Sequence, residues 1–86
     1  MKYSIKILKS AQKKLSKIDE VSQDRIIEAI RGLANQPRPR GCKKLSNRPA
    51  WRMSVGNYRV IYEIYDNELR ILVIALGHRR DVYRGL

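Results

Sequence analysis

The sequence predicts an α+β fold in the order β-α-α-β-β-β, with an antiparallel sheet and two N-terminal helices packed on one of its faces. Three observations predict it. Apolar residues between Ser22 and Gln36 recur every three to four positions, as in an amphipathic helix. From Trp51 onward apolar and polar residues alternate, which is typical of strands. Gly56-Asn57 then separates two such strands, and both residues tolerate the positive φ of a two-residue turn.

The N-terminal part of the chain is expected to hold one strand and both helices. Alternation over residues 3–8 predicts the strand. Ser10 can cap a short helix with apolar residues at positions 11, 15 and 18, and Asp19 or Ser22 can cap the second helix. The second helix is expected to stop at residues 36–39, because proline disfavours helix in the residue before it. Its apolar stripe consists of Ile26, Ile27, Ile30, Leu33 and Ala34.

The C-terminal part is expected to form a three-stranded antiparallel meander. Proline and glycine predict a loop over residues 37–49. The turns between the strands are expected at Gly56-Asn57 and Asp66-Asn67. The strands are predicted over residues 51–55, 58–65 and 69–76. Residues 1–86 are expected to form a single domain. One face of the sheet is left partly open, and a ligand could lie there.

The composition is strongly basic. Nineteen Lys and Arg residues against eight Asp and Glu residues leave a formal net charge of +11. Such a domain suggests nucleic acid, an anionic membrane surface or an acidic protein as partner, and RNA is the partner we expect. No apolar run reaches the ~18–20 residues of a membrane span, and the N-terminus lacks a signal peptide. Cys42 has no partner for an intrachain disulfide. We therefore expect a cytoplasmic protein without a membrane partner.

Part of the positive charge is predicted to gather on one sheet face. Across the first turn Ser54 faces Arg59, and alternation places Arg52 and Ile61 on the same side. If Asp66-Asn67 is also a two-residue turn, Arg59 pairs with residue 74 of the next strand. The apolar residues expected on the Arg59 face are Leu72, Ile74 and Leu76.

Two arginines on one face suggest a phosphate site, because the guanidinium fork matches phosphate oxygens. The alternative is that Arg52 and Arg59 are solvated surface residues, or that Arg59 pairs with Glu63.

A second cluster follows the last strand, where His78, Arg79, Arg80 and Tyr83 lie within six residues. Histidine titrates near neutrality and suits acid or base chemistry. The alternatives are an exposed, inert His78 and a Tyr83 that packs against the C-terminal turn.

Other chemistries find little support. One histidine and one cysteine give no zinc set, no pair of carboxylates suggests magnesium, and no glycine-rich phosphate loop is present. A nuclease built on this chain is expected to need neither metal nor cofactor.

The segment WRMSVGNYRVIYEIYDNELRILVIALGHRRDVYR resembles the RelE/ParE toxin superfamily, and the upstream helices and the Lys43-Lys44-Leu45 loop extend the resemblance over nearly the whole chain. Members are toxins neutralised by a co-expressed antitoxin. The RelE branch cleaves mRNA on the ribosome without a metal ion, and the ParE branch poisons DNA gyrase.

The resemblance also assigns residues. Arg59 matches the strand arginine that contacts the scissile phosphate, Arg79 matches the arginine near the end of the last strand, and Tyr83 matches the C-terminal tyrosine of the active site. Arg52 stands where the RelE branch often has a lysine, and Ser54 where a second lysine occurs. The Ser54 departure weakens a role for a lysine as general base.

The resemblance implies a metal-independent, ribosome-dependent endoribonuclease toxin that inhibits translation, held in a hetero-oligomer by its cognate antitoxin. A ParE-like gyrase poison and an inactive basic RNA-binding domain are the alternatives. The expected catalytic residues are Arg59, Arg79, His78, Tyr83 and Arg52. The expected substrate-binding residues are Lys43, Lys44, Arg48, Ser54 and Arg80.

Overall fold

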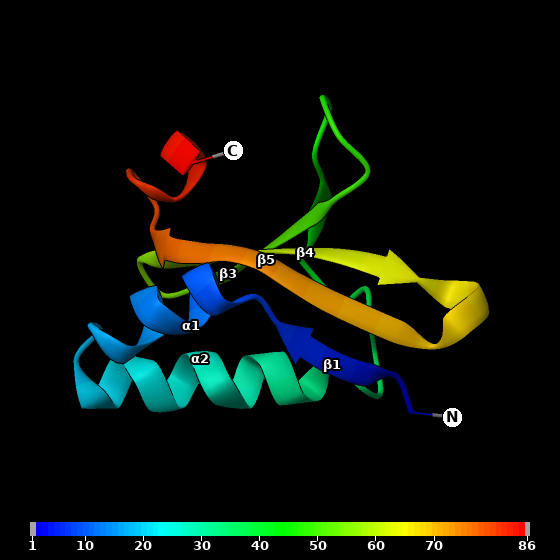
Figure 1. The fold of residues 1–86 in the computed structure, drawn as a ribbon, viewed down its shortest axis with the longest axis horizontal. Helices are drawn as coiled ribbons and strands as arrows, with labels where there is room; N and C mark the ends of the chain where they lie inside the picture. The colour runs from blue at the N-terminus through cyan, green and yellow to red at the C-terminus, as the bar shows by residue number, and fades with distance from the viewer. Residues whose placement is uncertain (1, 86) are drawn as a thin grey trace.

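The computed structural model describes residues 2–85 as two helices packed under a five-stranded sheet, which confirms the predicted α+β class and element order (Figure 1). The strands are β1 (Ser4–Ile7), β2 (Lys43–Lys44), β3 (Trp51–Val55), β4 (Tyr58–Tyr65) and β5 (Arg70–His78). The helices are α1 (Lys9–Ser16) and α2 (Glu20–Gly32), and two short 3-10 helices are η1 (Asp66–Glu68) and η2 (Val82–Gly85). Strand β2 lies inside the segment predicted as a loop.

The sheet is mixed rather than antiparallel throughout. Its strand order is β1-β5-β4-β3-β2, and β1 pairs with β5 in parallel while the other pairs are antiparallel. The two helices cause this difference, because they return the chain across one face to the end of the sheet where β1 began. Tyr3 N–H donates to the Ala34 carbonyl at 2.8 Å, which ties the segment after α2 to the start of β1.

The helix caps match the prediction only for α2. The Asp19 side chain accepts a hydrogen bond from Ser22 N–H at 3.0 Å, and this bond lowers the pKa of Asp19. Helix α1 instead starts at Lys9, so Ser10 lies inside it and the predicted Ser10 cap is wrong. Strand β1 ends at Ile7, which leaves room for the helix to begin earlier. Helix α2 ends at Gly32, before the predicted stop, and residues 33–36 continue as turns.

The main core lies between the helices and the sheet. Tyr62 is buried in it, and its hydroxyl donates to the Pro37 carbonyl at 2.8 Å, while burial raises the pKa of Tyr62. The largest fully buried side chains of this core are Tyr62, Ile26, Leu33, Ile71, Leu76, Val60 and Val73. A smaller apolar cluster of Ala50, Ile61 and Val82 lies on the other face of the sheet.

The β3–β4 hairpin has the predicted register, with Ser54 opposite Arg59 and Gly56 at φ 59° in the turn. The predicted β4–β5 register is wrong, because Arg59 pairs with Gly77 rather than with Ile74. The turn is longer than two residues, since η1 is followed by Leu69 in the left-handed region at φ 50°. A bulge at Ile61/Tyr62 adds a further shift.

The shift changes which apolar residues share the Arg59 face. Leu76 is buried in the main core on the helix side, so its predicted place beside Arg59 is wrong. Ile74 packs against the smaller cluster on the Arg59 side, as predicted.

Three distant segments meet at Asp66, in the β4–β5 turn. The Tyr3 hydroxyl donates to Asp66 at 2.6 Å, and the Arg38 guanidinium binds the same carboxylate at 2.9 Å. Arg38 also lies over the Trp51 ring, 5.1 Å from its centroid. These contacts, led by the Arg38 bond, lower the pKa of Asp66. The cluster fastens the N-terminus and the loop after α2 to the end of the sheet.

We expect Asp66 to make stability depend on acid pH. Since its folded-state pKa is lowered, its contribution is full above the unfolded value of about 3.9 and is lost as pH falls through the folded-state pKa. Asp66→Asn should therefore lower Tm at pH 7 and flatten the fall of Tm below about pH 4. Thermal unfolding from pH 7 to pH 2 measures this. Asp24→Asn, on the exposed side of α2, is the control, and an equal flattening in that variant would contradict the assignment.

We expect Leu33→Ala to cost about 2–5 kcal/mol of unfolding free energy, because this fully buried side chain would leave a cavity between α2 and the sheet. Val21→Ala removes a side chain that is 66% exposed and is the matched control. Urea unfolding monitored by Trp51 fluorescence measures both variants. Equal urea midpoints for the two variants would show that the Leu33 side chain does not stabilise the core.

Candidate functional site

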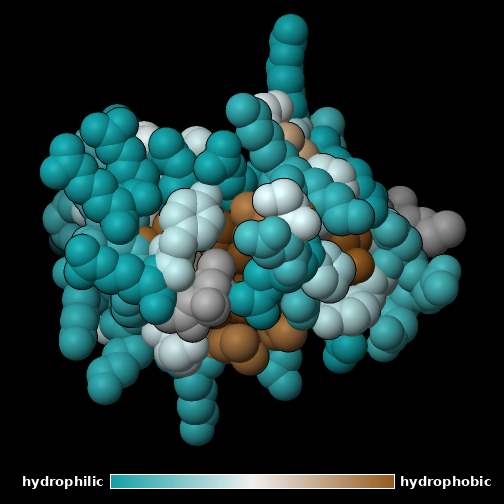
Figure 2. Space-filling view, turned by 90° about the horizontal axis from the view of Figure 1, so that it is seen from above, coloured by the Kyte–Doolittle hydropathy of each residue, from teal (hydrophilic) through white to brown (hydrophobic). Residues whose placement is uncertain are grey.

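The face of the sheet opposite the helices carries the predicted arginines. Arg52 pairs with Ile61 and Arg59 with Ser54, so the four share one side, as alternation predicted. Lys43 pairs with Arg52 and adds a further positive charge to this face. In Figure 1 the loop between β2 and β3 and the segment after β5 both rise on this side, away from α1 and α2. Figure 2 views it from above and shows hydrophilic side chains around a smaller exposed hydrophobic area.

A groove of about 640 Å³ lies on this face, between the β2–β3 loop and η2. The loop keeps its shape through two backbone hydrogen bonds, Leu45 N–H to the Ala50 carbonyl at 2.8 Å and Ala50 N–H to the Arg48 carbonyl at 2.7 Å. Its lining residues are Leu45, Ser46, Asn47, Arg48, Arg52 and Tyr83. None of these is acidic and two are arginines, so the groove favours an anion.

Arg52 and Tyr83 meet in the groove. Arg52 Nη1 donates to the Tyr83 hydroxyl oxygen at 3.0 Å. The neighbouring Val82 is buried against Ile61 and Ala50, which anchors η2 over the sheet. The Tyr83 side chain itself remains 40% exposed. Because the hydroxyl oxygen accepts from Arg52, its own proton is free to point toward a bound molecule.

Arg59 lies on the same face but nearer the hairpin turn. Its Nη1 donates to two backbone carbonyls, those of Gly56 at 3.1 Å and of Tyr58 at 3.0 Å. Arg79 is exposed beside the same turn, since its N–H donates to the Asn57 carbonyl at 2.8 Å. Neither residue lines the groove. Arg59 and Arg79 therefore lie at the hairpin end of the open face, whereas Arg52 and Tyr83 lie in the groove.

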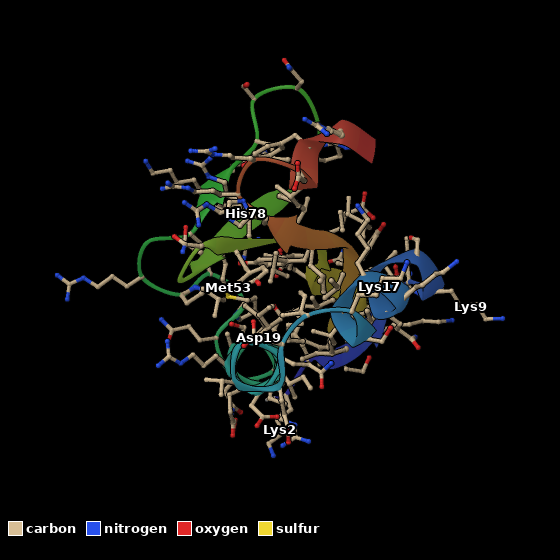
Figure 3. The ribbon with its side chains drawn as sticks, turned by 90° about the vertical axis from the view of Figure 1, so that its left-hand side faces the viewer. Lys2, Lys9, Lys17, Asp19, Met53 and His78 are labelled. Atoms are coloured by element: carbon tan, nitrogen blue, oxygen red, sulfur yellow. The ribbon has the colours of Figure 1, made fainter. Side chains whose placement is uncertain are left out.

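Of the expected catalytic residues, His78 is the one that the structure places away from Arg52 and Tyr83, on the other face of the sheet. His78 pairs with Tyr58, and the rings meet edge to face with centroids 6.1 Å apart. Tyr58 packs against the main core, so His78 faces the helices and the sheet separates it from the groove. Figure 3 shows His78 at the end of β5, above Lys17, which directly follows α1, and Asp19, which precedes α2. The cause is the β5 register, which places Gly77 on the Arg59 side and His78 on the other.

His78 lines a second groove, of about 480 Å³, along α1. Lysines form much of its rim, and Ile18 contributes an apolar side chain. Its lining residues are Ser10, Lys13, Lys14, Lys17, Ile18, Gly77, His78 and Asp81.

The remaining predicted residues are spread over the surface. Lys44 pairs with Trp51, which packs against the main core, so it lies on the opposite side of β2 from Lys43. Ser54 borders a small hollow formed by the loop before β2. Arg80 is exposed, and its N–H donates to His78 Nδ1 at 3.3 Å. Within residues 2–85, no three His, Cys, Asp or Glu side chains lie close enough to hold a metal ion.

Sequence reasoning missed Ser46 and Asn47, which form one wall of the groove. The signal was available in the run Ser46-Asn47-Arg48-Pro49, since these residue types favour a turn and two lysines precede it. A turn between two paired strands would have placed this run over the sheet.

The sequence model described as the ParE toxin of the type II toxin–antitoxin system parDE matches residues 5–83. The chain belongs to this toxin family. It is also similar to an Escherichia coli RelE-like toxin protein, with 25% identity over 87 residues that cover 96% of this chain and 92% of the relative.

Solved structures carry the same fold as this RelE/ParE toxin. The archaeal RelE–RelB complex from Pyrococcus horikoshii has a TM-score of 0.82 and 29% identity, covering 92% of this chain and 97% of that one. The toxin–antitoxin complex RelBE2 from Mycobacterium tuberculosis has a TM-score of 0.81 and 22% identity, covering 92% and 100%. At that identity the likeness shows the fold alone. The family agrees with the superfamily that the sequence resembles, and it identifies the chain as a toxin of a type II toxin–antitoxin system.

No helix among the described residues combines the length and the hydrophobicity needed to cross a membrane.

Proposed function

We propose that this toxin is a RelE-type endoribonuclease that acts in the cytoplasm, cleaves mRNA on the ribosome without a metal ion and thereby inhibits translation. The observation that carries the proposal is the Arg52–Tyr83 hydrogen bond in a groove whose lining holds no acidic side chain. Arg52 Nη1 and the Tyr83 hydroxyl oxygen lie 3.0 Å apart, so a cation and a hydroxyl group that can donate its proton stand side by side, and both assist phosphodiester cleavage by an internal 2′-OH.

Arg52 would stabilise the phosphate. As the 2′-oxygen attacks phosphorus, negative charge builds on the non-bridging oxygens, and a guanidinium held in place by a neighbour meets that charge without reorganising. Arg48 on the groove wall and Lys43 beside Arg52 add positive potential and would hold the flanking backbone.

Tyr83 would act as the general acid. When the bond from phosphorus to the 5′-oxygen breaks, the Tyr83 hydroxyl gives its proton to the departing oxygen and is reprotonated by water. The proton of the attacking 2′-OH leaves to water through the open groove. The products are a 2′,3′-cyclic phosphate and a 5′-hydroxyl end. His78 is given no proton transfer in this scheme, because the sheet separates it from the groove.

Arg59 and Arg79 would bind the RNA strand on the hairpin side. Arg59 Nη1 is engaged by two carbonyls, so direct contact of that nitrogen with the scissile phosphate requires the side chain to leave the turn. The proposal therefore places Arg52 at the reacting phosphate and Arg59 with Arg79 at neighbouring phosphates.

A gyrase poison is the second candidate, and the family description favours it, since the matching sequence model is that of ParE toxins. Pulse-labelling after induction separates the two functions. Early loss of protein synthesis supports RNA cleavage, and early loss of DNA synthesis with DNA damage supports gyrase poisoning.

We expect Arg52→Ala to slow mRNA cleavage by about 10²–10³-fold, and Tyr83→Phe by about 10²-fold or more, because the first loses charge stabilisation and the second loses the acid. Purified toxin is mixed with programmed ribosomes and mRNA in EDTA, and primer extension maps the ends. The same mRNA without ribosomes tests ribosome dependence.

Arg31→Ala, which removes one exposed arginine from the last turn of α2, is the control for loss of one positive charge and should leave the rate unchanged. Intact mRNA with the folded wild-type toxin would reject the ribonuclease proposal. Full cleavage by Tyr83→Phe would remove Tyr83 from the mechanism.

The antitoxin partner is proposed to bind through acidic side chains. The structural neighbours include toxin–antitoxin complexes, and this chain carries a net charge of +11. The lysine-rimmed groove along α1 lies on the opposite side of the sheet from the catalytic groove. An acidic segment of the antitoxin would bind in this lysine-rimmed groove, and a different part of the antitoxin would cover the groove that holds Arg52 and Tyr83.

We expect the double change Lys13→Glu and Lys17→Glu to weaken the complex with the co-expressed antitoxin and to reduce the loss of affinity with added salt, since two attractive charges become repulsive. Binding measured by calorimetry at two salt concentrations tests this. Lys6→Glu on the exposed side of β1 is the control. If the affinity of the double variant for the antitoxin falls with salt as much as that of the wild type, the antitoxin does not bind along this groove.

A further inference from the structure

The chain reverses direction immediately after β5, and His78 accepts two hydrogen bonds at the reversal. Its backbone carbonyl accepts from Asp81 N–H at 2.8 Å, which closes a four-residue turn. Its side-chain Nδ1 accepts from Arg80 N–H at 3.3 Å. Arg79 N–H donates to the Asn57 carbonyl. Every backbone N–H from Arg79 to Asp81 therefore has an acceptor, and one of the three is the imidazole.

The imidazole is held in one orientation. It is half-buried on the helix side of β5, and the Tyr58 ring meets it edge to face at an interplanar angle of 79°. Because Nδ1 accepts the hydrogen bond, the proton of the neutral ring is on Nε2. A ring fixed in this way offers a rigid acceptor in the position that an aspartate or asparagine side chain takes in an Asx turn.

The reversal sets the path of η2, which starts one residue after Asp81. From there Val82 enters the small apolar cluster on the far side of the sheet, and the Tyr83 hydroxyl reaches Arg52. Only two residues separate Arg80 from Tyr83 in the sequence. A change in the backbone conformation of the turn would therefore shift the position of the Tyr83 side chain.

We propose that His78 is a positioning residue. Its Nδ1 fixes the turn after β5 and so places the Tyr83 hydroxyl on Arg52 from the opposite face of the sheet. This assigns the histidine a role through the backbone and none in proton transfer. Its effect on cleavage rests on the proposed function of Tyr83, while its effect on the turn does not.

The experiment uses three variants of the full chain. In His78→Asn the side-chain oxygen stands where Nδ1 stood, so the acceptor remains and proton transfer by an imidazole is lost. His78→Phe keeps the ring against Tyr58 and loses the acceptor. His78→Ala loses both. Hydrogen exchange of the Arg80 amide, followed by NMR, reports the turn, and ribosome-dependent mRNA cleavage reports the site.

We expect His78→Asn to keep the wild-type exchange rate and the wild-type cleavage rate. His78→Ala and His78→Phe should each speed exchange of the Arg80 amide about fivefold and lower cleavage by a similar factor, as expected for the loss of one neutral hydrogen bond. An asparagine variant that cleaves as poorly as the alanine variant would overturn the proposal in favour of proton transfer. A wild-type exchange rate of the Arg80 amide in both His78→Ala and His78→Phe would overturn the proposal as well. If the wild type cleaves no RNA, the proposed function fails, and the exchange rates still decide the role of His78 in the turn.

Discussion

The alternation of side chains along β4 is the constraint on which the rest of the molecule depends. Val60 and Tyr62 point to the helices and are buried in the main core, while Arg59 and Ile61 point to the open face. One strand in the middle of the sheet thus supplies both the packing that stabilises the fold and the platform that carries the site. A slip of one residue would exchange the two faces, and the apolar core strongly disfavours it.

The open face divides positive charge between two kinds of position. Arg52 is held by Tyr83 and Arg59 by the hairpin carbonyls, so these two guanidinium groups have defined partners on the sheet. Arg79 and Arg48 are exposed at the rims. A guanidinium that is already held in place can stabilise localised negative charge without reorganising, and exposed cations attract a polyanion at longer range. The open face therefore combines guanidinium groups that have fixed partners with exposed positive charges at its edges.

Local patterns predicted the hairpin, the Asp19 cap and the shared face of Arg52, Ser54 and Arg59, because each depends on residues close in sequence. The β4–β5 register could not be predicted, since it depends on the left-handed Leu69 and on a bulge that leaves no clear mark in the sequence. That register decides the side on which His78 lies. The groove itself depends on the β2–β3 loop and η2 folding over the same strands, which is a tertiary contact between segments that no periodicity connects.

The pairing of β1 with β5 has a consequence for how the molecule assembles. Ser4 lies opposite Arg70, so this pair closes a long loop, whereas β3, β4 and β5 are joined by short turns. Closing a long loop costs more chain entropy and delays the contacts that depend on it. All residues that line the groove with Arg52 and Tyr83 lie between residues 45 and 83, where short turns join β3, β4 and β5, while β1 packs against the main core. We therefore expect the segment that carries the candidate site to fold before β1 joins the sheet.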